Sequence, residues 1–173
     1  MGSRRIASRA ARGVLTLFVA FAVMLGISSQ PASAMTVTQY GKAASYPFAN
    51  SSTAQANWNA DPLGYYKRSC ASYTAWRVLH SNHVKLNRAG SASNWKKWAQ
   101  NHGYKTSSTP RRGAVAWWSR GHVAWVEKVF YSKGKLTIRV HEYSWNRYYH
   151  KDVRDVSKGS NGYPQSFILV PMR

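Results

Sequence analysis

Cysteine is the scarcest reactive residue in this chain: Cys70 is the only one among 173 residues. A single cysteine excludes an internal disulfide. Three alternatives remain open: a thiol that pairs with another molecule, a free thiol kept for its reactivity, or a buried and inert side chain. Composition alone does not distinguish these alternatives, so they must be distinguished by the local sequence around Cys70.

The chain also lacks an apolar run long enough for a transmembrane helix. Its apolar stretch at residues 14–27 follows a segment with four arginines and precedes the small residues Ala32-Ser33-Ala34. That order is typical of a secretory signal peptide. We therefore expect residues 1–34 to be removed, leaving an extracellular, monomeric protein with no transmembrane segment. A retained membrane anchor is the alternative.

Acidic residues are scarce as well, with five Asp and Glu against 25 Lys and Arg and a net charge of +20. Loss of the four arginines in residues 1–34 would lower that charge to +16. A secreted protein this basic is expected to bind polyanions, and export favours an anionic cell surface over nucleic acid. We expect no nucleic-acid partner, because no recognisable binding module is present. The alternative is that the charge serves only solubility.

The rest of the chain is expected to form one domain. Residues 35–60 are rich in Ser, Thr, Ala and Asn, which predicts a mature N-terminal segment lying on a domain that spans residues 61–173. Apolar residues at helical spacing predict a helix from Cys70 to about Leu79, with Ser69 as its N-cap.

Further elements follow the cysteine helix. A second helix is predicted at 93–100, capped by Ser93 or Asn94 and ended by Gly103. Strands are then predicted at 113–118, 122–131, 135–143 and 166–171. Helices followed by a run of antiparallel strands predict an α+β fold, with N-terminal helices packed on an antiparallel sheet.

Cys70 is expected at the first turn of its helix, where free backbone amides favour a thiolate. A nucleophilic cysteine also needs a base and a group that orients the base. His80 and His83 lie too far along the helix, His102 is expected to cap the second helix, and His150 lies in a loop. His122 and His141 remain as candidates for the base.

His122 is the better placed of the two, since it opens a strand directly after a loop. The turn at 132–134 pairs the flanking strands so that residue 122 lies opposite about residue 143. This register brings Glu142 close to His122. The sequence therefore predicts a site that contains Cys70, His122 and Glu142.

Several segments together resemble the CHAP domain, a cysteine- and histidine-dependent amidohydrolase/peptidase of the NlpC/P60 group with a papain-like fold. The resemblance covers roughly residues 60–146, and its most specific parts are the Gly-His and Glu-Tyr segments. In chain order the matching segments are Cys70-Ala-Ser-Tyr-Thr-Ala-Trp-Arg, Asn94-Trp95, Trp98, His102-Gly103-Tyr104, Pro110, Gly113-Ala-Val-Ala, Gly121-His-Val-Ala-Trp-Val-Glu127 and Glu142-Tyr-Ser-Trp145.

The resemblance implies hydrolysis of amide or peptide bonds in peptidoglycan, by an N-acetylmuramoyl-L-alanine amidase or an endopeptidase. It implies Cys70 as nucleophile, His122 as general base and then acid, and Glu142 as the group that orients His122. Peptidoglycan and anionic cell-wall polymers are the expected partners, and the protein is expected to associate with the cell wall.

Two positions depart from the family pattern. Arg68-Ser69 replaces the frequent Gly-Gln before the cysteine, which leaves the Cys70 backbone amide as the expected oxyanion donor. Ser144 replaces a frequent Asn and is an auxiliary candidate, while Glu127 is interpreted as structural. Asp61 is the only acid near the cysteine, so we expect no calcium site, no other metal and no cofactor.

The tryptophans near the predicted site have two interpretations. Trp117, Trp118 and Trp145 are expected to line the substrate groove, with Trp125 nearby in sequence; alternatively, large aromatics only fill the core.

Three other functions compete with hydrolysis by Cys70. A non-catalytic cationic cell-wall-binding or antimicrobial protein would explain the charge and the tryptophans, but not the order of Cys70, His122 and Glu142. A zinc hydrolase using His122, His141 and Glu142 is weak, because neighbours on a strand point to opposite faces. A nucleic-acid binder is weaker still.

Overall fold

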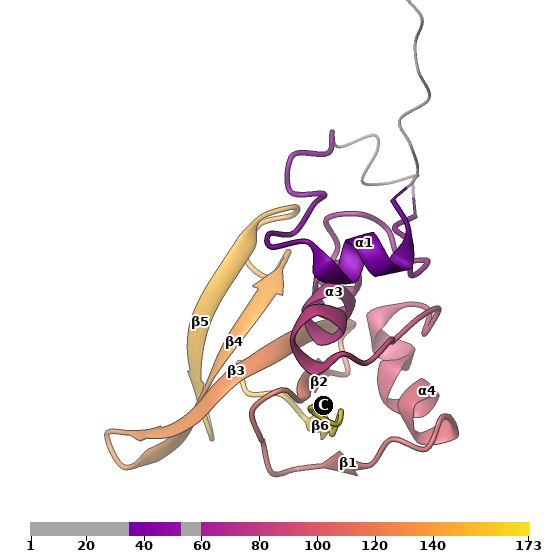
Figure 1. The fold of residues 1–173 in the computed structure, drawn as a ribbon. Coiled ribbons are helices and arrows are strands. Elements are labelled where there is room, and N and C mark those ends of the chain that lie inside the picture. Colours follow the sequence, from indigo (N-terminus) through magenta and orange to yellow (C-terminus); the bar gives the residue numbers. More distant parts are fainter. Residues whose placement is uncertain (1–34, 53–59) are drawn as a thin grey trace, which may run out of the picture. The chain divides into compact units, whose positions relative to one another are not determined.

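The computed structural model describes residues 35–52 and 60–173, and its elements are traced in Figure 1. The predicted signal peptide, residues 1–34, lies outside the described residues, as does part of the predicted 35–60 segment. Within the described ranges, no helix combines the length and apolar character that a membrane span requires.

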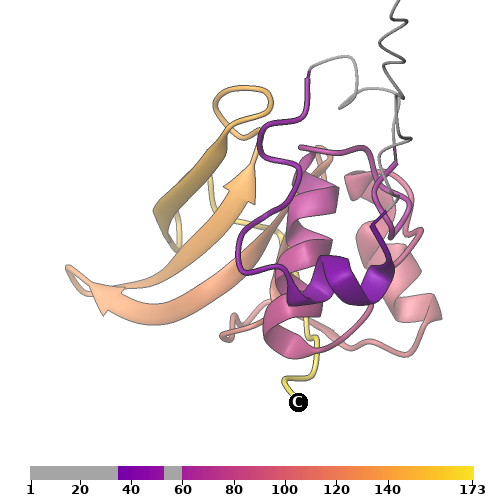
Figure 2. The ribbon, with the colours of Figure 1, turned by 45° about the horizontal axis from the view of Figure 1, so that its top comes forward.

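An antiparallel sheet forms the framework of the domain. Its strand order is β1-β6-β2-β3-β4-β5, and every neighbouring pair is antiparallel. Helix α3 packs on β3 and β4, and α1 packs on α3, as Figures 1 and 2 show. This confirms the predicted α+β class with N-terminal helices on an antiparallel sheet. The elements are α1 (Val37–Lys42), α3 (Cys70–Asn82), η1 (Ala92–Asn94), α4 (Trp95–Asn101), β1 (Thr106–Ser107), β2 (Val115–Trp118), β3 (His122–Ser132), β4 (Lys135–Tyr143), β5 (Lys151–Ser157) and β6 (Ser166–Ile168).

Strand β3 is buried on both faces, as its continuous apolar sequence predicts. Val123 and Trp125 join the core between the sheet and the helices. Ala124 and Val126 join a second cluster on the opposite face of the sheet. A β-bulge between Val126 and Lys128 shifts the pairing of β3 with β4 by one residue. The helices therefore cover one face of β3, while loops and β5 help to cover the other.

The predicted helices are present with shifted bounds. Ser69 caps α3 as expected, but the helix continues to Asn82. The second helix starts at Trp95 after a 3₁₀ turn, and Asn94 occupies its N-cap position without making a side-chain hydrogen bond. Gly103 follows the helix with φ of 78°, in the left-handed region that glycine enters without strain.

Three elements were not predicted, namely α1, β1 and β5. Helix α1 has only six residues, and its apolar side is represented by the fully buried Tyr40. Strand β5 has only Val156 in the core, so it shows no alternation of apolar and polar residues. Both elements depend on tertiary contacts more than on their own sequence pattern.

Candidate active site

Cys70 is the first residue of α3, and Ser69 organises the turn that presents it. The Ser69 hydroxyl accepts a hydrogen bond from the Ser72 amide at 3.0 Å, and the Ser69 carbonyl accepts from Tyr73 at 3.1 Å. The amides of Cys70 and Ala71 have no acceptor in the described chain. Free amides at the start of a helix attract negative charge. The Cys70 side chain is half-buried and so remains accessible from solvent.

A buried hydrogen-bond network centred on Asp61 holds this end of α3. One carboxylate oxygen of Asp61 accepts from the amides of Leu63 at 2.8 Å and Tyr65 at 3.0 Å. The other accepts from the hydroxyls of Ser72 at 2.6 Å and Tyr40 at 3.1 Å. Asp61 thus ties α1 and the 61–65 turn to the first turn of the cysteine helix. Its carboxylate is fully engaged in these contacts.

His122 and Glu142 lie next to each other on the face of the sheet opposite the helices. The His122 Nε2 atom is 2.7 Å from a carboxylate oxygen of Glu142, which is completely buried. Both side chains point to the face that carries Ala124 and Val140. The paired strands β3 and β4 therefore bring together the two residues that the predicted hairpin placed side by side.

Cys70 lies close enough to His122 to influence the protonation of the imidazole. Burial lowers the pKa of His122, but hydrogen bonds and charge interactions with Cys70 and Glu142 outweigh it and raise the pKa to about 9. Because Nε2 is bonded to Glu142, Nδ1 is the ring nitrogen left for the sulfur. A pKa of about 9 leaves His122 protonated at neutral pH, with its Nε2 bonded to Glu142 and its Nδ1 free to face the sulfur.

Arg154, on β5, is a member of this site that the sequence did not predict. Its Nε donates to the Glu142 oxygen that His122 leaves free. Its guanidinium lies 3.8 Å above the Trp145 ring and 5.4 Å from Trp118. The sequence signal for β5 was weak: residues 151–156 stand between two turn-rich segments, without alternation. Arg154 gives buried Glu142 a second cationic partner.

Of the three tryptophans predicted to line the groove, Trp118 and Trp145 pack against His122, whereas Trp117 contacts the segment that carries Ala92. Trp118 is buried and donates to the Gly162 carbonyl, with its ring centroid 5.2 Å from that of His122. Trp145 approaches His122 edge-on at 4.9 Å. Trp117 donates to the Ala92 carbonyl at 2.9 Å. Trp118 and Trp145 thus pack against the imidazole and shield it from water.

Ser144 does not hydrogen-bond His122. Its hydroxyl donates to the Arg68 carbonyl at 3.2 Å and accepts from the Tyr149 amide at 2.9 Å. Arg68, which precedes Ser69, has a left-handed φ of 61°, and its guanidinium donates to the Tyr149 carbonyl at 2.9 Å. Ser144 and Arg68 therefore join the loop after β4 to the turn that leads into Cys70.

A groove of about 450 Å³ opens directly beside Cys70. No tryptophan is among its lining residues. Tyr66 lines it and is 62% exposed, so an aromatic ring is available on the wall. Tyr66 was not predicted as a groove residue, because it lies in the segment before the helix and no motif marks it. The other lining residues are Ala60, Gly64, Tyr65, Ser69, Ala71, Gly90, Ser91, Ala92 and Gly121.

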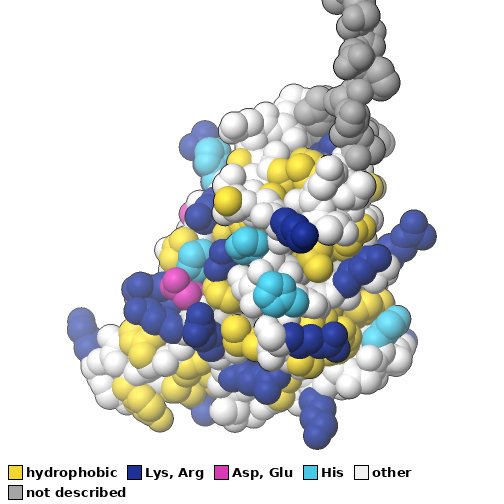
Figure 3. Space-filling model, in the orientation of Figure 1, with side chains coloured by type: hydrophobic (Ala, Val, Ile, Leu, Met, Phe, Trp, Pro, Cys, Tyr) yellow, Lys and Arg dark blue, Asp and Glu magenta, His cyan; other side chains and the backbone are white. Residues whose placement is uncertain are grey.

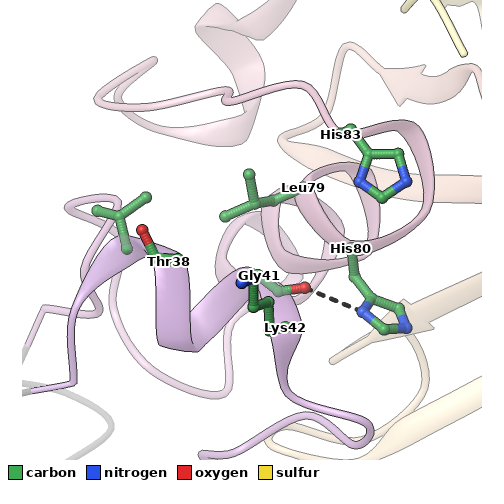
Figure 4. Close-up of a pocket in the computed structure, with 7 residues that line it drawn as sticks. Thr38, Gly41, Lys42, Leu79, His80 and His83 are labelled. Carbon is green, nitrogen blue, oxygen red and sulfur yellow. Dashed lines mark hydrogen bonds between the residues drawn. The ribbon is translucent and has the colours of Figure 1, made fainter. Parts of the chain in front are cut away.

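The remaining histidines lie apart from the sulfur. His80 and His83 border a separate groove between α1 and α3, in which the Nδ1 atom of His80 is 2.9 Å from the Gly41 carbonyl oxygen (Figure 4). His102 caps α4 through the Trp98 carbonyl at 2.7 Å, as expected. His141 lies on the face of β4 opposite Glu142, so the set of three proposed for zinc is not brought together.

Comparison with known protein families identifies a family to which this region is similar. The family model of the CHAP domain matches residues 59–144, which include the start of α3, the β3–β4 hairpin and all three predicted catalytic residues. The chain carries a CHAP domain. Its boundaries agree with the roughly 60–146 over which the sequence resembles that family.

A solved structure is similar to this CHAP domain. It is the crystal structure of an N-acetylmuramoyl-L-alanine amidase from Staphylococcus aureus, with a TM-score of 0.51 and 26% sequence identity. The match covers 61% of this chain but only 31% of the amidase chain. A search of the curated proteins found no match.

Proposed function

We propose that this protein is a secreted peptidoglycan hydrolase that cleaves amide or peptide bonds with Cys70, His122 and Glu142. One observation carries the proposal: Cys70 stands at a helix start beside an open groove and within electrostatic range of His122, which bonds the buried Glu142. The CHAP domain and the likeness to an N-acetylmuramoyl-L-alanine amidase support the same reaction class and favour the amide bond between sugar and stem peptide.

In the first half of the proposed reaction, Cys70 attacks the scissile carbonyl. The protonated His122 stabilises the thiolate form of Cys70. The sulfur forms a bond to the carbonyl carbon, and the carbonyl oxygen becomes an oxyanion. The Cys70 amide, which has no acceptor in the described chain, is positioned to bind that oxyanion. Ser69 is engaged in capping the helix, so its hydroxyl is not the expected donor.

His122 then acts as acid and later as base. It donates its Nδ1 proton to the leaving amine, and the carbon–nitrogen bond breaks to leave a thioester on Cys70. Neutral His122 next takes a proton from a water molecule, which attacks the thioester carbonyl and releases a carboxylate. The thiolate and the protonated His122 are restored. Glu142 keeps Nδ1 directed at the sulfur throughout, because it holds Nε2.

The decisive experiment is digestion of purified peptidoglycan by the purified protein and by its Cys70→Ala variant. We expect the native protein to release fragments and the variant to release none, while both unfold at the same temperature. Mass spectrometry of the fragments identifies the bond: free glycan chains indicate an amidase, and peptide-bearing glycans cut within the stem indicate an endopeptidase.

Other outcomes would reject the proposal. Fragment release that persists in Cys70→Ala would rule out the cysteine mechanism, and loss of activity with a chelator alone would favour a zinc hydrolase. Binding to peptidoglycan without any fragment release by the native protein would favour the non-catalytic cationic alternative.

A further inference from the structure

A second groove, of about 430 Å³, lies between α3, the loop at residues 44–50 and the ends of β4 and β5. We call it the basic groove. It shares no lining residue with the groove beside Cys70. Three of its lining residues carry basic side chains: Arg77, His141 and Lys151. Its other walls include the aromatic residues Tyr73, Trp76 and Tyr143.

Strand register brings the basic side chains to one side of the sheet. His141 and Tyr143 alternate along β4 and therefore point to the same face, and Lys151 of β5 pairs directly opposite Tyr143. Arg77 reaches the same place from α3, with its guanidinium 4.2 Å above the Trp125 ring. The His141 ring contacts that same indole edge-on at 5.9 Å. Side chains from β4, β5 and α3 thus meet at the basic groove.

Several buried donors in the basic groove have no acceptor among the described residues. They are the Trp76 indole nitrogen, the Arg77 Nε and one ring nitrogen of His141, whose neutral imidazole carries a single N–H. Among the described residues, Glu127 is the acid beside them: its partly exposed carboxylate is 3.3 Å from His141 Nε2, within ion-pair distance. Buried polar atoms normally find a partner. An acceptor that enters the groove from solvent would supply it.

We propose that the basic groove binds a phosphate group, as free phosphate or as the phosphodiester of an anionic polymer. Donors approach from the helix and from two strands, which suits a tetrahedral anion with several oxygens better than a planar carboxylate. Arginine and lysine are the side chains that bind phosphate most strongly in proteins. Burial lowers the pKa of His141, and repulsion from Arg77 and Lys151 lowers it further against the opposing effect of Glu127, so a bound anion would relieve that repulsion.

The basic groove lies close to the catalytic residues without being part of them. Arg77 follows Cys70 by seven residues on α3, or about 10 Å along the helix axis. A phosphate on a cell-wall polymer bound here would hold that polymer beside the helix that presents the nucleophile. Phosphate binding in the basic groove does not depend on whether Cys70 is catalytic.

Binding can be measured by NMR titration of the ¹⁵N-labelled full chain with inorganic phosphate, glycerophosphoglycerol and acetate at constant ionic strength. We expect phosphate and the phosphodiester to shift the Trp76 indole resonance saturably, and acetate to bind at least about tenfold more weakly. Tighter binding of the phosphodiester indicates a polymer as the source, and tighter binding of inorganic phosphate indicates the free ion. No saturable shift, or equal binding of acetate, overturns the proposal.

Charge variants test the residues of the basic groove. Lys151→Gln, on an exposed part of an edge strand, and Arg77→Gln are each expected to weaken phosphate binding by about tenfold. Lys133→Gln in the exposed β3–β4 turn removes the same charge and should change affinity by less than about twofold. If Lys133→Gln weakens phosphate binding as much as the groove variants do, binding is non-specific charge attraction and the proposal is overturned. Cys70→Ala should bind phosphate normally, which separates this result from that of the proposed hydrolysis.

Discussion

Arg154 helps to hold Glu142 in place beside the His122 imidazole. Glu142 is fully buried, and in the described chain its two oxygens are bonded by His122 and Arg154. Removal of one partner from a buried ionic group leaves the other charge poorly compensated. Trp145 packs against both the guanidinium and the His122 ring, so the position of Arg154 also supports the imidazole.

We therefore predict that Arg154→Met lowers kcat by about 10- to 100-fold, because Glu142 can then move and His122 loses its alignment with the sulfur. Loss of the arginine charge also strengthens the attraction of Glu142 for protonated His122. The alkaline limb of the kcat/KM profile should therefore shift to higher pH. Steady-state kinetics across pH on a soluble peptidoglycan fragment measure both effects.

Arg139→Met is the matched control for this variant. Arg139 makes a two-point ion pair with Asp155 on the same strand as Arg154, at 2.7 and 2.8 Å, but the pair is on the surface. Surface pairs contribute little, so kcat and the alkaline limb should stay unchanged. If both variants lose activity equally with no shift of the limb, Arg154 has only a structural role.

The raised pKa of His122 predicts the pH dependence of activity. Burial lowers this pKa, but the contacts with Cys70 and Glu142 raise it from 6.5 to about 9. In the proposed mechanism, the charged imidazole supplies the proton to the leaving amine. Activity should therefore fall as pH rises through about 9, and kcat/KM measured across this range tests it. A profile that is flat to well above that pH would contradict this assignment.

The same shift affects stability. Because the folded pKa of His122 lies above the unfolded value, its contribution is complete below about pH 6.5 and is lost as pH rises through about 9. The difference in free energy of unfolding between the native protein and His122→Gln should accordingly shrink from about pH 6 to about pH 10. Denaturant titrations at the two pH values measure it.

At the scale of elements, the start of α3 depends on a short helix far from it in sequence. Tyr40 of α1 is fully buried, and its hydroxyl donates to the Ser72 carbonyl at 2.7 Å while also contacting Asp61. We predict that Tyr40→Phe lowers the free energy of unfolding by about 1–3 kcal/mol, because buried acceptors lose their donor. Chemical denaturation measures this change.

Tyr131→Phe provides the comparison for that variant. Tyr131 is 74% exposed in the β3–β4 hairpin, so loss of its hydroxyl should change stability by less than about 0.5 kcal/mol. A similar change in both variants would show that the Tyr40 hydroxyl contributes nothing beyond a surface hydroxyl. Tyr40→Phe should also reduce activity if the Asp61 network positions Cys70.

The elements that could be predicted are those whose own residues carry the pattern. Ser69 and the apolar spacing after Cys70 mark α3, and the alternation from Lys135 to Tyr143 marks β4. Strand β5 could not be predicted, because four of its seven residues are charged and only one is buried, so its order comes from pairing with β4. Arg154 was missed for that reason.

At the scale of the whole molecule, the parts of the site that could be predicted from the sequence are again those that lie close together in the chain. His122 and Glu142 could be paired from the sequence because one hairpin joins them, and the turn sets the register. The walls of the groove beside Cys70 could not be predicted, because they come from segments that meet only in the folded chain. These segments contain Tyr66, Gly90–Ala92 and Gly121. Trp118 shows the converse, since an aromatic residue next to the site in sequence is buried behind His122.

At the scale of the whole molecule, the dominant feature is a strong excess of basic residues. Lys and Arg outnumber Asp and Glu by 25 to 5, and dark blue side chains far outnumber magenta ones on the face in Figure 3. A surface of one sign attracts polyanions over a distance set by salt. The basic groove would add a local contact to this general attraction.

We predict that retention on isolated cell walls falls steeply with salt, because ~0.01 M NaCl gives a Debye length of ~30 Å and ~1 M reduces it to ~3 Å. The measurement is the fraction of Cys70→Ala protein that sediments with walls, since this variant should not degrade them. Walls stripped of their anionic polymers serve as the control and should retain less protein at low salt. Retention that is independent of both salt and anionic polymer would mean that the protein is held by contacts with peptidoglycan itself, and that the charge serves only solubility.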